Sequence, residues 1–153
     1  MPASLLVSRT IHPGEETVID VTSGMYSVVF KDNGETGYVY ALDNGRPQPV
    51  LDALHIYNVE QFEKAPSKRR ADIEIWASED GLAALVKLNG RDEAYFDFAD
   101  RRSVCRSCFP RAVGGYTQSH DWDDSALYRF YPERKQQPAS EKKAAPKKRV
   151  TKE

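Results

Sequence analysis

Two Asn-Gly dipeptides, Asn33-Gly34 and Asn89-Gly90, each lie between two short runs of apolar and β-branched residues. Asparagine and glycine both tolerate the positive φ angles of a tight hairpin turn, so this arrangement is the strongest short-range signal for a β-hairpin. Strands joined by so few residues pair antiparallel. The chain is therefore constrained to fold around antiparallel strands.

Seven segments have the alternation or the β-branched and aromatic content of strands. They are Leu5–Ile11, Glu16–Val21, Met25–Lys31, Tyr38–Leu42, Ala71–Ala77, Leu82–Leu88 and Ala94–Phe98. We expect a helical turn followed by a strand within Val50–Phe62. A short closing helix is expected at Asp123–Tyr131, with Asp123 or Asp124 as its N-cap. Together these elements predict an α+β fold, in which antiparallel strands form one sheet or a small sandwich and one or two short helices cover it.

Charge divides the chain into an acidic body and a basic tail. Residues 1–132 carry 14 Lys and Arg against 20 Asp and Glu, whereas residues 133–153 carry 8 against 3. The tail has no aromatic residue and cannot bury enough apolar surface to offset its ordering entropy, so we expect it to be disordered. We predict one folded domain, residues 1–132. No apolar run approaches the ~20 residues of a membrane span, and the N-terminus has no secretory signal, so we expect a soluble, cytoplasmic protein without membrane contact.

Two stretches carry a family resemblance. They are Tyr26–Leu42, with the sequence YSVVFKDNGETGYVYAL, and Leu51–Val59, with the sequence LDALHIYNV. With the stretch from Ile75–Ala77 through Phe96–Phe98, they resemble a bacterial family of small proteins catalogued as a domain of unknown function. The resemblance extends over about residues 5–125 and implies a bacterial origin, without implying an activity, a cofactor or a catalytic residue. A small, acidic, mostly-β protein is also similar in general character to many bacterial immunity proteins, which is an analogy of fold only.

The first functional hypothesis is a binding module with an acidic docking face. Its candidate residues are Trp76, Asp97, Asp100, Asp121, Trp122, Asp123 and Asp124. Such a face would attract a basic protein and speed its encounter, as in an immunity protein or an antitoxin, with the aromatic residues supplying affinity. The plainer alternative is that these carboxylates are N-caps and solvated surface. The sequence does not specify an oligomeric state.

A second hypothesis places a small-molecule or metal site in the body. His55, inside an apolar strand with Tyr57 nearby, is the best single candidate for a pocket side chain, although a core histidine held by one hydrogen bond has the same pattern. Cys105 and Cys108 have the spacing of one ligand pair of a tetrahedral zinc site, with His120 and Asp121 or Asp123 as further candidate ligands. The second close pair of ligands is missing, so ordinary thiols are the simpler interpretation, and we predict no cofactor.

A third hypothesis assigns weak, sequence-independent nucleic-acid contact to the tail, whose Lys142–Arg149 segment is basic. A solubilising role for the tail is the alternative. The chain contains no phosphate-binding loop and no Gly-x-Ser-x-Gly motif. No set of residues indicates a reaction, so the sequence does not predict an enzyme.

Overall fold

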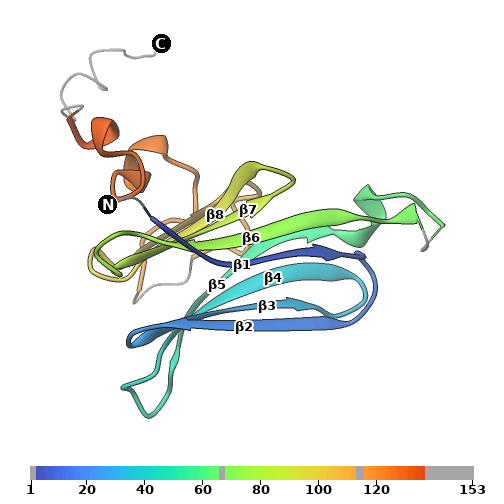
Figure 1. Ribbon diagram of the computed structural model, residues 1–153, viewed down its shortest axis with the longest axis horizontal. Helices are drawn as coiled ribbons and strands as arrows, with labels where there is room; N and C mark the ends of the chain where they lie inside the picture. The colour runs from blue at the N-terminus through green and yellow to red at the C-terminus, as the bar shows by residue number, and fades with distance from the viewer. Residues whose placement is uncertain (1–2, 66–67, 113–115, 137–153) are drawn as a thin grey trace.

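The chain folds into two antiparallel β-sheets that share one core (Figure 1). The computed structural model describes residues 3–65, 68–112 and 116–136. The four-stranded sheet contains, in order, β2 (Thr17–Ser23), β3 (Tyr26–Asp32), β4 (Thr36–Asp43) and β5 (Val50–Asn58). The five-stranded sheet contains, in order, β1 (Ser4–Ile11), β6 (Ala71–Ala77), β7 (Ala83–Leu88), β8 (Arg91–Asp97) and β9 (Arg102–Cys105). The small sandwich anticipated as one form of the fold is therefore the architecture.

Both Asn-Gly hairpins are present and join neighbouring strands. Asn89 and Gly90 link β7 to β8 with φ angles of 52° and 81°, and Gly34, between β3 and β4, has a φ of 100°. Most residues with a Cβ rarely adopt such angles, whereas glycine adopts them freely and asparagine tolerates them, which is why these two residues occupy the turns. The turns fix the register of each hairpin, and all pairs of adjacent strands are antiparallel.

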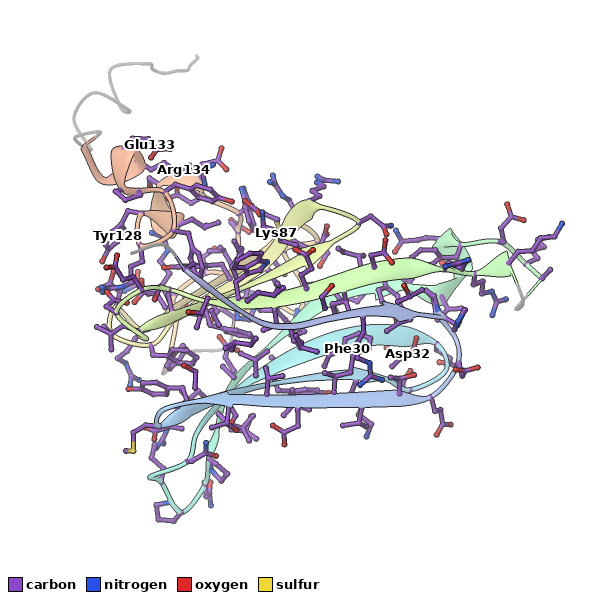
Figure 2. All side chains as sticks on the ribbon, viewed as in Figure 1. Phe30, Asp32, Lys87, Tyr128, Glu133 and Arg134 are labelled. Carbon is purple, nitrogen blue, oxygen red and sulfur yellow. The ribbon has the colours of Figure 1, made fainter. Side chains whose placement is uncertain are left out.

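The main core lies between the two sheets and is built from alternate residues of their strands. Its least exposed side chains include Phe30, Val39, Leu54, Ile73, Ile75, Val86 and Phe96, each at 0 % exposure. In Figure 2 the labelled Phe30 lies between the two layers. Burying each of these side chains contributes about 1.5–3 kcal/mol relative to leaving it in water. The alternation that predicted the strands therefore also assigns their buried face.

A second, smaller cluster covers the outer face of the five-stranded sheet. Leu85, Tyr95 and Val104 point outward from β7, β8 and β9 and pack against Leu127 of the C-terminal segment. That segment contains the 3₁₀ turns η3 (Asp124–Leu127) and η4 (Pro132–Gln136) and lies beyond the sheet in Figure 1. The five-stranded sheet is thus covered on both faces over β7, β8 and β9.

The predicted helices are wrong. None of the described residues is in an α-helix, so the α+β class is corrected to a β-sandwich with 3₁₀ turns. The closing element is η3, with Asp123 as its N-cap as expected. Pro132 follows this cap after a few residues and prevents a longer helix. An α-helix as short as this has only marginal stability. Val50–Asn58 is strand throughout because it pairs with β4, and the turn η1 (Val59–Gln61) follows the strand instead of preceding it.

The last residue that the structure describes is Gln136, in η4. Apart from its first four residues, the predicted disordered tail of residues 133–153 lies outside the described residues. Within the part of the chain that the structure describes, no helix has the length and apolar character needed to span a membrane.

Candidate functional site

The seven residues predicted to form an acidic docking face fall into three groups. Asp121–Asp124 line one cavity at the C-terminal segment. Asp97 and Asp100 belong to a separate cluster around an arginine of that segment. Trp76 lies on β6, beneath the segment. The structure therefore brings four of the seven residues together.

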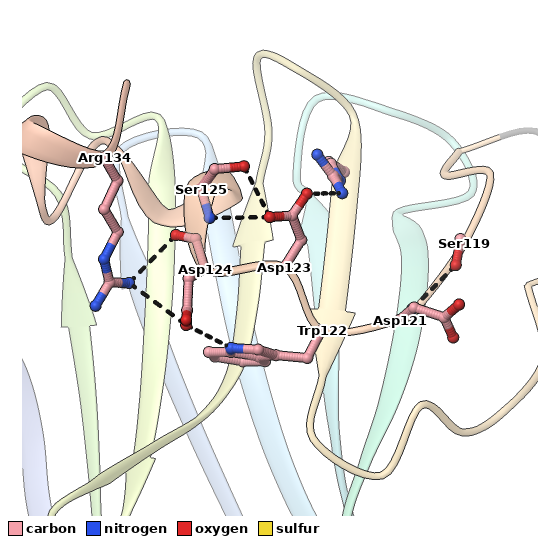
Figure 3. A pocket seen from close by; sticks show the side chains of 8 residues that line it. Ser119, Asp121, Trp122, Asp123, Asp124, Ser125 and Arg134 are labelled. Atoms are coloured by element: carbon pink, nitrogen blue, oxygen red, sulfur yellow. Dashed lines mark hydrogen bonds and ion pairs between the residues drawn. The ribbon is translucent and has the colours of Figure 1, made fainter. Parts of the chain in front are cut away.

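The cavity forms where β9 meets the C-terminal segment, and its volume is about 640 Å³ (Figure 3). It is lined by Arg102, Ser119, Asp121, Trp122, Asp123, Asp124, Ser125 and Arg134. Three carboxylates against two guanidinium groups leave the lining with one net negative charge. The volume lies in the range of sites that hold small ligands or single side chains.

Asp123 attaches the wall of the cavity to β9. Its Oδ1 accepts hydrogen bonds from the Ser125 backbone N–H at 3.0 Å and from Ser125 Oγ at 2.7 Å, which caps η3. Its Oδ2 accepts one from Arg102 Nη2 at 2.9 Å. Burial by itself raises the pKa of Asp123, but the hydrogen bonds from Ser125 and the contact with Arg102 outweigh it and hold this pKa below its usual value. Asp123 is thus ionised and links η3 to β9.

Trp122 is held on two sides. Its indole N–H donates to Asp124 Oδ1 at 2.8 Å, and the guanidinium carbon of Arg106 lies 3.9 Å from the ring centroid. Arg134 Nη1 lies 4.0 Å from the same Asp124 oxygen and donates to the Asp124 backbone carbonyl at 3.3 Å. These contacts hold the indole in the cavity lining.

Asp121 differs from the other two carboxylates of the cavity. Asp121 is exposed, as Asp124 is, but its backbone N–H donates to Ser119 Oγ at 3.0 Å and no described side chain engages its carboxylate. No hydrogen bond or ion pair joins its carboxylate to another side chain among residues 3–65, 68–112 and 116–136. Figure 3 shows Ser119 and Asp121 on the side of the cavity opposite Arg134. The negative charge that the cavity offers to a partner is therefore centred on Asp121.

Asp97 and Asp100 are engaged by Arg129. The guanidinium donates from Nε to Asp97 Oδ2 at 2.9 Å, from Nη2 to Asp100 Oδ1 at 3.3 Å and from Nη1 to Asp80 Oδ2 at 2.9 Å. Asp97 is 1 % exposed and also accepts the Tyr95 hydroxyl. This cluster attaches the C-terminal segment to the sheet. Sequence reasoning missed Arg129 because its three partners lie 29 to 49 residues away along the chain.

Trp76 packs against the same apolar cluster as Trp122. Its indole N–H donates to Glu74 Oε1 at 3.0 Å, within β6. The two tryptophans therefore share a cluster, but only Trp122 lines the cavity.

His55 and Tyr57 lie on opposite faces of β5. Strand alternation places residues i and i+2 on one face, but the β4–β5 register shifts between Gly37, opposite Tyr57, and Tyr38, opposite His55. This bulge at Ile56 turns Tyr57 into the core, 1 % exposed, while the His55 ring packs against Tyr38 on the outer face. The two side chains do not face a common cavity.

Both ring nitrogens of His55 have hydrogen-bond partners. Nδ1 lies 2.9 Å from Ser107 Oγ, and Nε2 lies 2.9 Å from Asn58 Oδ1. Ser107 Oγ also donates to the His55 carbonyl at 3.1 Å and accepts the Phe109 backbone N–H. His55 and Ser107 therefore tether the loop after β9 to β5, a contact between residues 52 positions apart that no local pattern predicts.

The candidate metal ligands are separately engaged. Cys105 is buried and its Sγ donates to the Phe109 carbonyl, whereas Cys108 is exposed. His120 is bonded to Asp52 and to the Pro110 carbonyl. Burial raises the pKa of the Cys105 thiol more than the hydrogen bonds from its neighbours lower it, which favours the neutral thiol. Among the described residues, no three His, Cys, Asp or Glu side chains are grouped so as to hold a metal ion.

Comparison with known proteins gives a family. Residues 11–131 match the family described as "Uncharacterized protein conserved in bacteria (DUF2251)". An uncharacterized protein of Haemophilus influenzae is 45 % identical over 75 residues, which cover 48 % of this chain and 45 % of the relative, so the match spans less than half of the relative's length. No solved structure matches the chain. Because the family match extends over most of the chain, as the resemblance predicted, the protein belongs to this family of uncharacterized proteins conserved in bacteria.

Proposed function

We propose that this protein is a binding module that docks a basic segment of a protein partner in the cavity around Asp121 and Trp122. One observation carries the proposal. Four residues predicted for a docking face, Asp121–Asp124, line a single cavity of about 640 Å³. The cavity combines a carboxylate that no described residue engages with an indole that is held in place.

A lysine or arginine side chain is complementary to this cavity in charge and has room to enter it. Its cationic end can pair with the Asp121 carboxylate, while its apolar stem packs against the Trp122 indole. A cation close to a tryptophan ring is stabilised by about 0.5–2 kcal/mol, depending on how far the site is desolvated. A carboxylate and an indole in the lining of one cavity therefore favour a cationic side chain over a neutral one.

The cavity is also preformed. Asp123 is held by Ser125 and Arg102, and Asp124 is held by Trp122 and Arg134. A partner does not have to order these side chains, and lower ordering entropy on binding improves affinity.

The charge of the body supports the same partner class. Residues 1–132 carry six more acidic than basic side chains, which speeds encounter with a basic protein at low ionic strength. Stable one-to-one docking of a basic protein, as immunity proteins and antitoxins achieve it, is the form of binding that we expect, with the cytoplasm as the place of action.

The test uses the two indole N–H resonances of the ¹⁵N-labelled full chain, which has two tryptophans. A Trp76→Phe variant assigns the two peaks. Titration with an acetylated, amidated tetra-arginine peptide is expected to shift the Trp122 peak saturably and to leave the Trp76 peak in place. The shift should weaken as salt is added, because exposed charges are screened over about 10 Å at 0.1 M salt.

Asp121→Lys is expected to abolish the shift of the Trp122 peak. The matched control is Asp20→Lys, which reverses an exposed carboxylate on the outer face of β2 and should leave the titration unchanged. An unmoved Trp122 peak in the wild-type protein, or equal peptide affinity in Asp121→Lys and wild type, contradicts the proposed docking site. A tetra-glutamate peptide that shifts the same peak contradicts the proposed charge of the partner.

A further inference from the structure

His120 directly precedes Asp121–Asp124, the residues that line the cavity, and it is 3 % exposed. Its side chain reaches away from the cavity to two other parts of the molecule. Nε2 lies 2.9 Å from Asp52 Oδ2 on β5, and Nδ1 is bonded to the backbone carbonyl of Pro110. The imidazole therefore connects the four-stranded sheet, the loop after β9 and the start of the cavity lining.

The main chain at this point is fixed to β9 as well. The Cys105 backbone N–H donates to the His120 carbonyl at 3.0 Å, and Cys105 forms a parallel bridge with Asp121. The position of His120 therefore determines the positions of Asp121 and Trp122, which follow it in the chain. Any change in the His120 side-chain contacts is transmitted to the cavity through one or two residues.

The two partners of the imidazole are both acceptors. A carbonyl oxygen and a carboxylate have no hydrogen to donate, and a neutral imidazole carries only one N–H. In the neutral ring, one nitrogen would direct its lone pair at an acceptor, and the Asp52 carboxylate is the more repulsive of the two. The imidazolium, with two N–H groups, satisfies both contacts at once.

The surroundings act in the same direction. Burial by itself lowers the pKa of His120, but the hydrogen bond to Asp52, the hydrogen bond to the Pro110 carbonyl and the charges of Asp52 and Asp121 together raise this pKa above its usual value. The neighbouring thiol of Cys105, on β9, has its own pKa raised by burial, which favours the uncharged form. The charged groups that act on the ring from β5 and from its own segment are therefore both carboxylates.

We propose that His120 is a positioning residue, whose protonated imidazole holds Asp121 and Trp122 in docking geometry and releases them as the pH rises through its titration. The consequence for partner binding rests on the proposed function, whereas the clamp itself is a property of the protein alone. Docking of a basic segment is then strongest on the acidic side of the His120 titration.

The first arm of the test uses the ¹⁵N,¹³C-labelled full chain without any partner, between pH 5.5 and 9.5. The His120 ring resonances are expected to titrate with a midpoint above the ordinary value for histidine of about 6.5. The Trp122 indole peak should shift with the same midpoint, whereas the Trp76 peak should not. A His120 midpoint at or below the ordinary value, or a Trp122 peak that ignores the His120 titration, overturns the proposal.

Asp52→Asn separates the clamp from a merely structural contact. The new amide can keep the Asp52 Oδ1 bond to the Ala53 backbone N–H, now 2.8 Å, and can donate a hydrogen to the neutral ring of His120. The fold should persist, the His120 midpoint should fall, and the Trp122 peak should lose its pH dependence. His12→Gln, which changes an exposed histidine bonded to the Arg69 carbonyl, is the matched control and should leave the Trp122 titration unchanged.

The second arm measures affinity for the tetra-arginine peptide, whose charge is constant over this range, at pH 6 and at pH 9. The wild-type affinity is expected to fall by at least about fivefold, the lower end of ordinary coupling between two sites. Asp52→Asn should show no such fall. A pH-independent affinity overturns the proposal, whereas a coupled His120 and Trp122 titration without any peptide binding leaves the clamp intact and refutes only the docking function.

Discussion

The outer faces of the two sheets differ. On the five-stranded sheet, Leu85 and Tyr95 point outward but are 1 % and 0 % exposed, because Leu127 and its neighbours pack over them. On the four-stranded sheet, Val18 points outward and is 61 % exposed. This face is turned away from the rest of the molecule in Figure 1. The five-stranded sheet thus buries both faces over β7–β9, whereas the four-stranded sheet leaves its outer face exposed at β2.

The difference shows where this fold makes a cavity. Two packed sheets give a filled core, and an open sheet face gives a flat surface. The C-terminal segment with η3 and η4 packs over the five-stranded sheet, and we call it the cover. The candidate site forms where the cover meets this sheet, at the contact between Arg102 of β9 and Asp123. Features that hold the cover in place are therefore the features on which the site depends.

Leu85→Ala tests how the cover packs on the sheet and has the largest expected effect on stability. Leu85 is 1 % exposed, so truncation should lower the free energy of unfolding by about 4 kcal/mol, within the usual range for Leu→Ala at a buried site that cannot collapse. Urea denaturation followed by far-UV circular dichroism measures it. Leu85→Met, which keeps the volume, should cost less than about 1.5 kcal/mol. A loss below 1 kcal/mol in Leu85→Ala would mean that the outer cluster is loosely packed, and the comparison would fail.

Arg129→Met tests the ionic attachment of the cover. Removing the guanidinium leaves the buried Asp97 carboxylate without its cation, which should cost about 3 kcal/mol. The Trp122 indole peak should also shift, because the cover loses its attachment to Asp80 and Asp100. Arg46→Met, at an exposed arginine in the β4–β5 loop, is the matched control and should change neither reading. Unchanged stability in Arg129→Met would show that apolar packing alone holds the cover.

The sheets and the attachment of the cover are not equally predictable from the sequence. Asn33-Gly34 and Asn89-Gly90 predict the β3–β4 and β7–β8 hairpins, because alternation and turn residues within a few positions determine them. Sequence reasoning missed β9 (Arg102–Cys105), which is short and lies at the edge of its sheet, next to β8. The N-cap at Asp123 is equally local. Arg129 is different, because its role depends on three carboxylates that only the folded sheet brings together. Local patterns thus predict the sheets but not the attachment of their cover.

The candidate site shows the same limit. The stretch Asp121–Asp124 was found because its carboxylates and indole are contiguous, and contiguous residues stay together in any fold. His55 and Tyr57 are close in the sequence of one strand, but the bulge in β5 places them on opposite faces. The clamp from His120 to Asp52 spans 68 positions and has no local signature. What sequence reasoning found is therefore the part of the site that does not depend on tertiary pairing.

Asp123→Ala tests the contact between the cover and β9. Loss of the N-cap bonds to Ser125 should cost about 1 kcal/mol at neutral pH. The folded-state pKa of Asp123 lies below its ordinary value of 3.8, so the contribution of the carboxylate is fully present above pH 3.8 and is lost as the pH falls through the lowered value. The stability difference between wild type and variant should therefore shrink in acid. Urea melts at several pH values measure this, and a difference that grows toward low pH would contradict the assignment.

Val18→Thr is the smallest expected effect and the sharpest contrast with Leu85. Both residues point outward from a strand, but Val18 is 61 % exposed on the edge strand β2. Threonine keeps the β-branched shape that a strand prefers and exposes its hydroxyl to water, so the free energy of unfolding should change by less than about 0.5 kcal/mol. Urea denaturation measured beside Leu85→Ala checks it. A loss above 1 kcal/mol in Val18→Thr would mean that this face is packed against something in solution, as in a complex between copies, and dilution of the protein should then reduce the loss.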